Sequence, residues 1–160
     1  MKSIIRDPKL APQGWDKIHW VMEHMPVLNS LNEEFGRTKP LAGVNMVVTV
    51  HLEAKTAYLC MVLKNAGANV AVTGSNPLST QDDVAAALAE SGVGVYAWYN
   101  TTPAEYDQFL HHALDTRPQI IIDDGGDLVS LLHGERADLA AQVMGGSEET
   151  TTGVLRLRAL

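Results

Sequence analysis

Hydrophobic residues follow two different spacings along this chain. After about the first forty residues, short continuous runs rich in Val and Ile alternate with longer segments in which apolar residues recur every three or four positions. Short apolar runs between Gly, Pro or polar residues are typical of buried parallel strands, and the longer spacing is typical of amphipathic helices. The pattern predicts strands at 44–50, 69–73, 93–98 and 119–123, and helices at 53–66, 80–91, 103–114 and 128–133.

The first forty residues follow the helical spacing only. Four apolar residues share one helical face between positions 12 and 24, and Pro26 separates this segment from a second helix that ends near Gly36. We expect residues 1–40 to be helices that pack on an α/β domain formed by residues 41–160.

The regular alternation of strand and helix predicts the fold class. Short crossovers between parallel strands give a doubly wound parallel sheet with helices on both faces, a three-layer α/β arrangement of the Rossmann or flavodoxin type. Ligands of such sheets bind at the carboxyl ends of the strands. The segments that follow the strands are therefore where a functional site is expected.

Polar residues do follow the predicted strands. Asp124 comes directly after the last strand and precedes Gly125 and Gly126, which allow the backbone to turn sharply and approach a ligand. We interpret Asp124 as a ligand-binding carboxylate and Asp127 as the N-cap of the next helix. His51 follows the first strand, where an imidazole can act as a general acid or base or can simply bond a neighbouring loop.

Two further loops carry candidate residues. Ser79 to Asp82 has the character of a capping box, so we expect one of its hydroxyls to cap the next helix, which leaves Asn76 and Gln81 free to bind a ligand. Glu53 and Lys55 lie in the first turn of a helix, where a solvated face and the rim of a pocket are equally compatible with their charge.

The segment 147–153 is an unusual run of carboxylates and hydroxyls. Adjacent glutamates repel each other and consecutive threonines are mediocre helix formers, so packing gives little reason for this composition. We interpret the run as a site for a polar ligand.

Composition narrows the possible functions. The chain has 160 residues, of which 46% are hydrophobic, and this suits one globular domain with a substantial core. The net charge of −7 without a basic patch argues against a nucleic-acid partner. Cys60 is the only cysteine, so we expect no disulfide and a reducing compartment. No metal-ligand spacing, signal peptide or membrane-spanning run is recognisable, and we expect a soluble, cytoplasmic protein without a metal.

Five motifs of the chain resemble the S-adenosyl-L-homocysteine hydrolase family in sequence, order and spacing. They occupy residues 51–57, 74–82, 96–98, 122–128 and 147–153. The resemblance covers nearly the whole chain and corresponds to the N-terminal part of the family's substrate domain. It implies that residues 41–160 form a truncated substrate-binding domain and that the family's NAD-binding Rossmann domain lies beyond Leu160.

The resemblance also implies residue roles. Enzymes of this family use tightly held NAD to oxidise the ribose 3'-hydroxyl, then eliminate homocysteine, add water and reduce the ketone again. By motif, Asp124 and His51 are the implied catalytic residues, and Glu149 is implied to hold the ribose hydroxyls. The implied substrate-binding set is Glu53, Lys55, Asn76, Ser79, Gln81, Asp124 and Glu149, and the implied NAD contacts are Thr150, Thr151 and Thr152.

One departure from the family leaves the purine base open. Glu53 and Lys55 stand where many members have Thr and Glu at the adenine edge. Lys55 donates hydrogen bonds and suits a 6-oxo purine, which points to S-inosyl-L-homocysteine, whereas Glu53 can accept from an adenine amino group.

The family's lysine and aspartate that act on the sugar, and its cysteine near the nicotinamide, have no counterpart in these 160 residues. We therefore expect this chain alone to be inactive and to bind NAD weakly. The full-length enzyme is expected to be a homotetramer of the methyl cycle in one-carbon metabolism, with one NAD per subunit. A noncatalytic nucleoside-binding module and an unrelated flavodoxin-like signalling domain are the alternatives.

Overall fold

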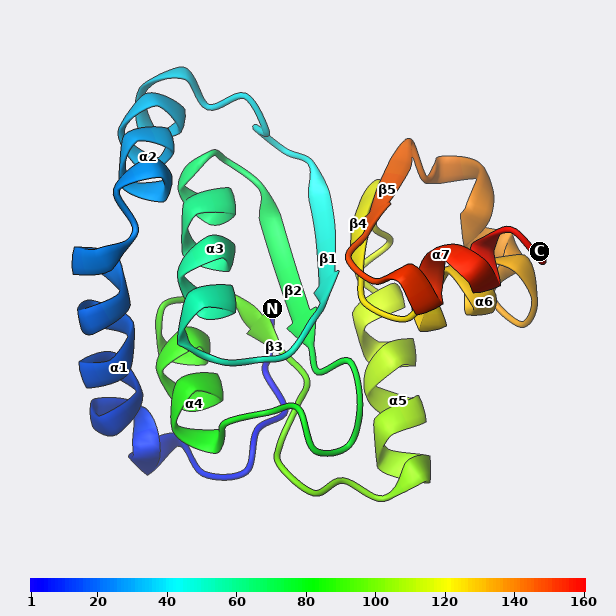
Figure 1. Ribbon diagram of the computed structural model, residues 1–160, viewed down its shortest axis with the longest axis horizontal. Helices are drawn as coiled ribbons and strands as arrows, with labels where there is room; N and C mark the ends of the chain where they lie inside the picture. Colours follow the sequence, from blue (N-terminus) through cyan, green and yellow to red (C-terminus); the bar gives the residue numbers. More distant parts are fainter.

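The computed structural model describes all 160 residues and contains one five-stranded sheet (Figure 1). All paired strands are parallel, and their order across the sheet is β3-β2-β1-β4-β5. The predicted doubly wound parallel sheet is confirmed. The strands are β1 (Asn45–Thr49), β2 (Asn69–Thr73), β3 (Gly94–Val95), β4 (Ile120–Asp123) and β5 (Gly145–Glu148).

Helices connect the strands and precede the sheet. The α-helices are α1 (Ala11–His24), α2 (Pro26–Thr38), α3 (Ala54–Asn65), α4 (Asp82–Glu90), α5 (Pro103–Leu114), α6 (Asp127–His133) and α7 (Thr151–Leu157), and the short 3-10 helices are η1 (Pro8–Leu10) and η2 (Ala137–Gln142). No helix has both the length and the apolar character that crossing a membrane requires.

Alternate residues of the central strands point to opposite faces of the sheet, as the pleat requires. Val48 and Val72 belong to the core that includes buried residues of α1, α3 and α4. Val47 and Ile121 belong to a second core under α5 and α6. Figure 1 shows these two groups of helices on opposite sides of the strands. The continuous apolar runs in the sequence therefore reflect strands that are buried on both faces.

Two strands differ from the prediction. β3 is shorter than the predicted 93–98, and the residue after it, Tyr96, forms an isolated parallel bridge with Ile4 of the N-terminal segment. β5 was not predicted at all, because its four residues Gly-Gly-Ser-Glu contain no apolar side chain. It joins the sheet through backbone pairing with β4 alone.

Two predicted helix caps were wrong. Gln81 is the N-cap of α4 and makes no side-chain cap bond, because the Ser79 hydroxyl is bonded instead within its own turn, to Asn76. Asp127 is the first residue of α6 and Gly126 stands at its N-cap. Since glycine has no side chain, the buried carboxylate of Asp123 accepts the Val129 amide of α6 in place of a cap.

Candidate functional site

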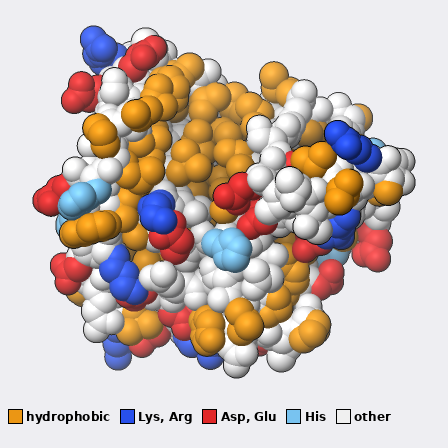
Figure 2. Space-filling model, in the orientation of Figure 1, with side chains coloured by type: hydrophobic (Ala, Val, Ile, Leu, Met, Phe, Trp, Pro, Cys, Tyr) orange, Lys and Arg blue, Asp and Glu red, His pale blue; other side chains and the backbone are white.

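The strand order brings the segments after β1 and β4 together. The crossover helices change faces of the sheet between β3 and β4, so neighbouring β1 and β4 form the switch point where doubly wound sheets bind ligands. His51 follows β1 and Asp124 follows β4, and His51 Nε2 lies 3.5 Å from Asp124 Oδ2. Figure 2 shows a histidine and acidic side chains together near the middle of this view, where β1 and β4 end in Figure 1.

The Asp124 carboxylate accepts no hydrogen bond from the protein, and its one charged neighbour within 4 Å is His51. The residue is only 9% exposed, and its Oδ2 is buried without a hydrogen-bond partner. Gly125 (φ 103°) and Gly126 (φ 79°) both adopt the left-handed conformation that glycine tolerates best, which confirms the predicted sharp turn. A buried carboxylate oxygen without a partner is costly, so its presence beside His51 indicates a place for a ligand.

A cavity of about 330 Å³ lies between the loops after β1 and β2, and of the pair His51 alone lines it. Backbone hydrogen bonds hold the two loops together, from Leu52 to Ser79 at 2.8 Å and from Gln81 to Leu52 at 2.9 Å. Its size lies within the range of small-molecule sites. Four predicted residues line it, and the complete lining is His51, Glu53, Leu78, Ser79, Thr80, Gln81 and Tyr99.

The predicted residues of the β2 loop hold the loop together. Asn76 Oδ1 accepts the Leu78 amide at 2.9 Å, and Ser79 Oγ donates to the Asn76 carbonyl at 2.9 Å. Gln81 Oε1 accepts from Lys17 Nζ of α1 at 2.8 Å. The amide nitrogens of the Asn76 and Gln81 side chains remain as donors for a ligand.

Glu53 and Lys55 occupy different positions relative to the cavity. Glu53 is the N-cap of α3, where its Oε1 accepts the Lys55 amide at 3.1 Å, and it lines the cavity. The Lys55 side chain is exposed, lies outside the lining and has no protein partner.

The interpretation that packing does not require the 147–153 run was wrong for half of its residues. The Glu148 carboxylate accepts the Gly125 amide at 2.8 Å, the Thr150 amide at 2.9 Å and the Thr150 hydroxyl at 2.8 Å. Thr150 in turn caps α7 by accepting the Gly153 amide at 2.9 Å. These residues join β5 to α7 and hold the turn after Asp124.

The side chains of Glu149, Thr151 and Thr152 make no hydrogen bonds within the protein. The Glu149 amide donates to the Asp123 carbonyl at 2.9 Å, while its exposed carboxylate has no partner. Thr151 and Thr152 are exposed on the first turn of α7, and their hydroxyls make no hydrogen bond. The structure contains no group of three or more His, Cys, Asp or Glu side chains that could hold a metal ion.

Asp123 was not identified from the sequence. It is 1% exposed, and its carboxylate accepts the Asp124 amide at 3.0 Å and the Val129 amide at 3.2 Å. Burial raises the pKa of Asp123 to about 6 despite those two hydrogen bonds, and the charges of Glu148 and Asp127 add to the increase. The sequence signal was the presence of two adjacent aspartates, of which the apolar pattern assigned Asp123 to the strand.

This shifted pKa predicts a pH-dependent stability difference. Because the folded pKa of about 6 lies above the ordinary 3.8, the folded state binds the proton more tightly, and the contribution of Asp123 to stability falls as pH rises between these values. Urea unfolding of the wild type and Asp123→Asn should therefore show the wild type losing about 2 kcal/mol relative to the variant between pH 4 and pH 7. A difference independent of pH would contradict the assignment.

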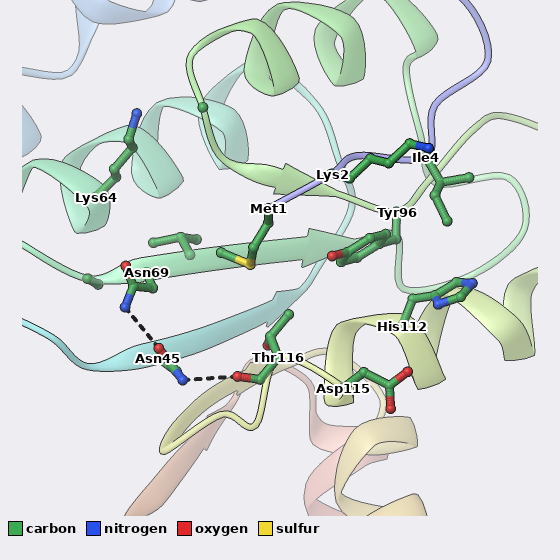
Figure 3. Close-up of a pocket in the computed structure, with 13 residues that line it drawn as sticks. Met1, Lys2, Ile4, Asn45, Lys64, Asn69, Tyr96, His112, Asp115 and Thr116 are labelled. Atoms are coloured by element: carbon green, nitrogen blue, oxygen red, sulfur yellow. Dashed lines mark hydrogen bonds between the residues drawn. The ribbon is translucent and has the colours of Figure 1, made fainter.

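A larger cavity extends to the opposite edge of the sheet. Its volume is about 740 Å³, and it is lined by Asn45 and Asn69 at the amino ends of β1 and β2 and by Tyr96, which follows β3 (Figure 3). Hydrogen bonds from Asn69 to Asn45 and from Asn45 to Thr116 join the starts of neighbouring strands there. None of the predicted site residues lines this cavity. The smaller cavity is the better candidate because it lies at the carboxyl edge and is lined by His51, the partner of Asp124.

Comparisons of the sequence with known proteins identify one enzyme family. The model of the S-adenosyl-L-homocysteine hydrolase family matches residues 2–144. An adenosylhomocysteinase from Pyrococcus abyssi is 55% identical over 156 residues, and an S-inosyl-L-homocysteine hydrolase from Methanopyrus kandleri is 54% identical over 156 residues. Each alignment covers 98% of this chain and 37% of the relative. The chain thus spans little more than a third of the length of these relatives.

Proposed function

This chain belongs to the S-adenosyl-L-homocysteine hydrolase family, and from that premise we propose that it provides the substrate-binding part of an NAD-dependent hydrolase that splits S-adenosyl-L-homocysteine into adenosine and homocysteine. The observation that carries the proposal is the His51 and Asp124 pair at the switch point, with an unpartnered carboxylate oxygen. The adjoining cavity and the free Glu149 carboxylate support it.

Asp124 and His51 would perform the proton transfers. The Asp124 carboxylate accepts no hydrogen bond from the protein, so it can take a proton from the nucleoside carbon that becomes acidic next to an oxidised sugar position. His51 is exposed and only 3.5 Å away, so its imidazole can donate to the leaving sulfur and then orient the incoming water.

Glu149 would hold the sugar. A carboxylate without a protein partner can accept hydrogen bonds from two neighbouring ribose hydroxyls, and these bonds strengthen as a hydroxyl loses its proton. The Glu149 amide bonds the Asp123 carbonyl, which fixes the backbone of Glu149 at the same sheet edge as Asp124.

Thr150, Thr151 and Thr152 would form part of the binding site for NAD. Bound NAD would supply the acceptor for the hydride that leaves the ribose 3' carbon. Thr151 and Thr152 present exposed, unbonded hydroxyls that can bond a dinucleotide. Thr150 is the third proposed contact, although its hydroxyl already donates to Glu148 and accepts from Gly153.

We predict that the isolated chain binds adenosine but does not turn over substrate. The support is that the matched relatives are almost three times as long. Calorimetry should detect adenosine binding, and a thiol assay should detect no homocysteine release from S-adenosyl-L-homocysteine with NAD. The full-length Pyrococcus abyssi relative is the positive control for the assay. Release of thiol by the pure chain would contradict the inactivity, and absence of adenosine binding would contradict the site.

S-inosyl-L-homocysteine is the second candidate substrate, because Lys55 has no protein partner and relatives of similar identity are named S-inosyl-L-homocysteine hydrolases. If Lys55 bonds a 6-oxo group, Lys55→Met should weaken inosine binding about tenfold and leave adenosine binding nearly unchanged. If Glu53 bonds the adenine amino group, Glu53→Gln should weaken adenosine binding instead. Calorimetric titration of both variants with both nucleosides separates the two. Equal losses for both nucleosides would show that neither residue distinguishes the bases.

The proposal also includes a cytoplasmic homotetramer that acts in the methyl cycle with one NAD per subunit. Cys60 is free and buried, which is compatible with a reducing compartment. Sedimentation of the full-length protein would test the assembly.

A further inference from the structure

The last paired positions of β2, β1, β4 and β5 form a polar row across the sheet. Thr73 pairs with Thr49, Thr49 with Asp123, and Asp123 with Glu148. The residues two positions before Thr73, Thr49 and Asp123 belong to the core under α5 and α6, so these three side chains face those helices. Asp123 is the most buried carboxylate of the protein and stands between the threonines and Glu148.

Asp123 bonds three separate segments. Its Oδ1 accepts the Asp124 amide at 3.0 Å, its Oδ2 accepts the Val129 amide at 3.2 Å, and its carbonyl accepts the Glu149 amide at 2.9 Å. The first bond fixes the backbone at Asp124, and the second anchors α6, which continues from the glycine turn. The third fixes the backbone that carries the Glu149 carboxylate.

The turn after Asp123 is held from other sides too. The Gly125 amide donates to Glu148, and Arg156 of α7 donates to the Gly125 carbonyl at 2.5 Å and to Asp127 at 2.8 Å. None of these bonds reaches the Asp124 amide. The direction of Asp124 toward His51 therefore depends on the Asp123 carboxylate.

We propose that Asp123 is a positioning residue of the nucleoside site, whose carboxylate sets the direction of Asp124 without contacting the substrate. That the site binds a nucleoside rests on the proposed function. The positioning role of Asp123 rests on the hydrogen bonds alone.

The surroundings of Asp123 make this positioning sensitive to pH. The groups that face it are Asp124, Glu148 of β5, Asp127 of α6 and Tyr106 of α5, whose hydroxyl donates to Asp127 at 2.9 Å. No cation forms an ion pair with Asp123, since Arg156 pairs with Asp127 and His51 faces Asp124. Protonation near pH 6 would weaken the bond to an amide, so the site should lose its geometry in mildly acidic solution.

The test compares the wild-type chain with Asp123→Asn, and uses Asp138→Asn as a control because Asp138 is an exposed carboxylate paired only with Arg136. Crystal structures measure the separation of His51 Nε2 and Asp124 Oδ2, and calorimetry measures adenosine affinity from pH 5 to pH 8. We expect the separation to exceed about 5 Å in Asp123→Asn alone, which is beyond direct contact. We expect its affinity at pH 8 to fall about tenfold, and the loss of wild-type affinity near pH 6 to be absent.

An unchanged separation in Asp123→Asn would overturn the proposal, whatever the affinity. If wild-type chain does not bind adenosine, the proposed function fails while the separation still decides the positioning role. Should Asp123→Asn not fold, amide resonances of the wild type replace it. Those of Asp124 and Val129 should then titrate with one midpoint near pH 6, and flat resonances would overturn the proposal.

Discussion

Replacing Asp124 by Asn should weaken adenosine binding by this chain about thirtyfold, because a hydrogen bond to a charged acceptor is worth roughly 2 kcal/mol. The side chains have the same size, so the change removes the charge and one acceptor from the buried position beside His51. Isothermal titration calorimetry at pH 7 measures the effect. In a full-length enzyme that carries this domain, the same substitution should remove turnover almost entirely, since the amide cannot accept a proton.

Asp138→Asn is the matched control for this substitution. Asp138 is exposed and lies far from the site in the fold, in η2, so its replacement should leave adenosine affinity unchanged. Circular dichroism of both variants checks that each is folded. If folded Asp124→Asn bound adenosine as tightly as the control, Asp124 would not be a ligand-binding carboxylate.

Replacing Gly153 by Ala should cost about 3 kcal/mol of stability and also weaken nucleoside binding. A Cβ atom at Gly153 would overlap the Glu148 carboxylate. Glu148 would have to move, and its bonds to the Gly125 amide and to Thr150 would be lost together. The turn next to Asp124 and the start of α7 would then lose their common support. Urea unfolding and adenosine calorimetry measure the two effects.

Gly145→Ala separates this contact from the general effect of replacing glycine. Gly145 lies in the same segment, at the start of β5, and a Cβ atom there meets nothing within 4 Å. Its substitution should change stability by less than about 0.5 kcal/mol. Equal losses for Gly145→Ala and Gly153→Ala would show that the overlap with Glu148 does not govern the effect.

The sequence predicts the part of the fold that hydrophobic burial determines. The runs that became β1, β2 and β4 are buried on both faces, so their composition alone identified them. β5 is an edge strand of four polar or glycine residues whose pairing depends on backbone bonds to β4. Such a strand has no hydrophobic side-chain pattern from which it can be predicted. Ser147 and Glu148 were therefore interpreted only as part of a ligand site.

The candidate site was predictable in its location but not in its internal bonding. The carboxyl ends of parallel strands must meet at one edge, which is why His51 and Asp124 were expected together. Which of two adjacent aspartates faces the core depends on strand register, and this made Asp123 invisible to the pattern. Polar side chains such as Ser79 can bond either a helix end or a local turn, and only tertiary structure decides between them.

The most direct test of the account is a map of adenosine binding on the isotope-labelled chain by ¹H–¹⁵N correlation spectra. The account predicts that adenosine shifts the amide resonances of His51, Glu53 and Asp124 at the carboxyl edge and leaves those of Asn69 and Tyr96 in place. Shifts confined to Asn69 and Tyr96, which line the larger cavity, would contradict the claim that the His51 and Asp124 pair marks the nucleoside site.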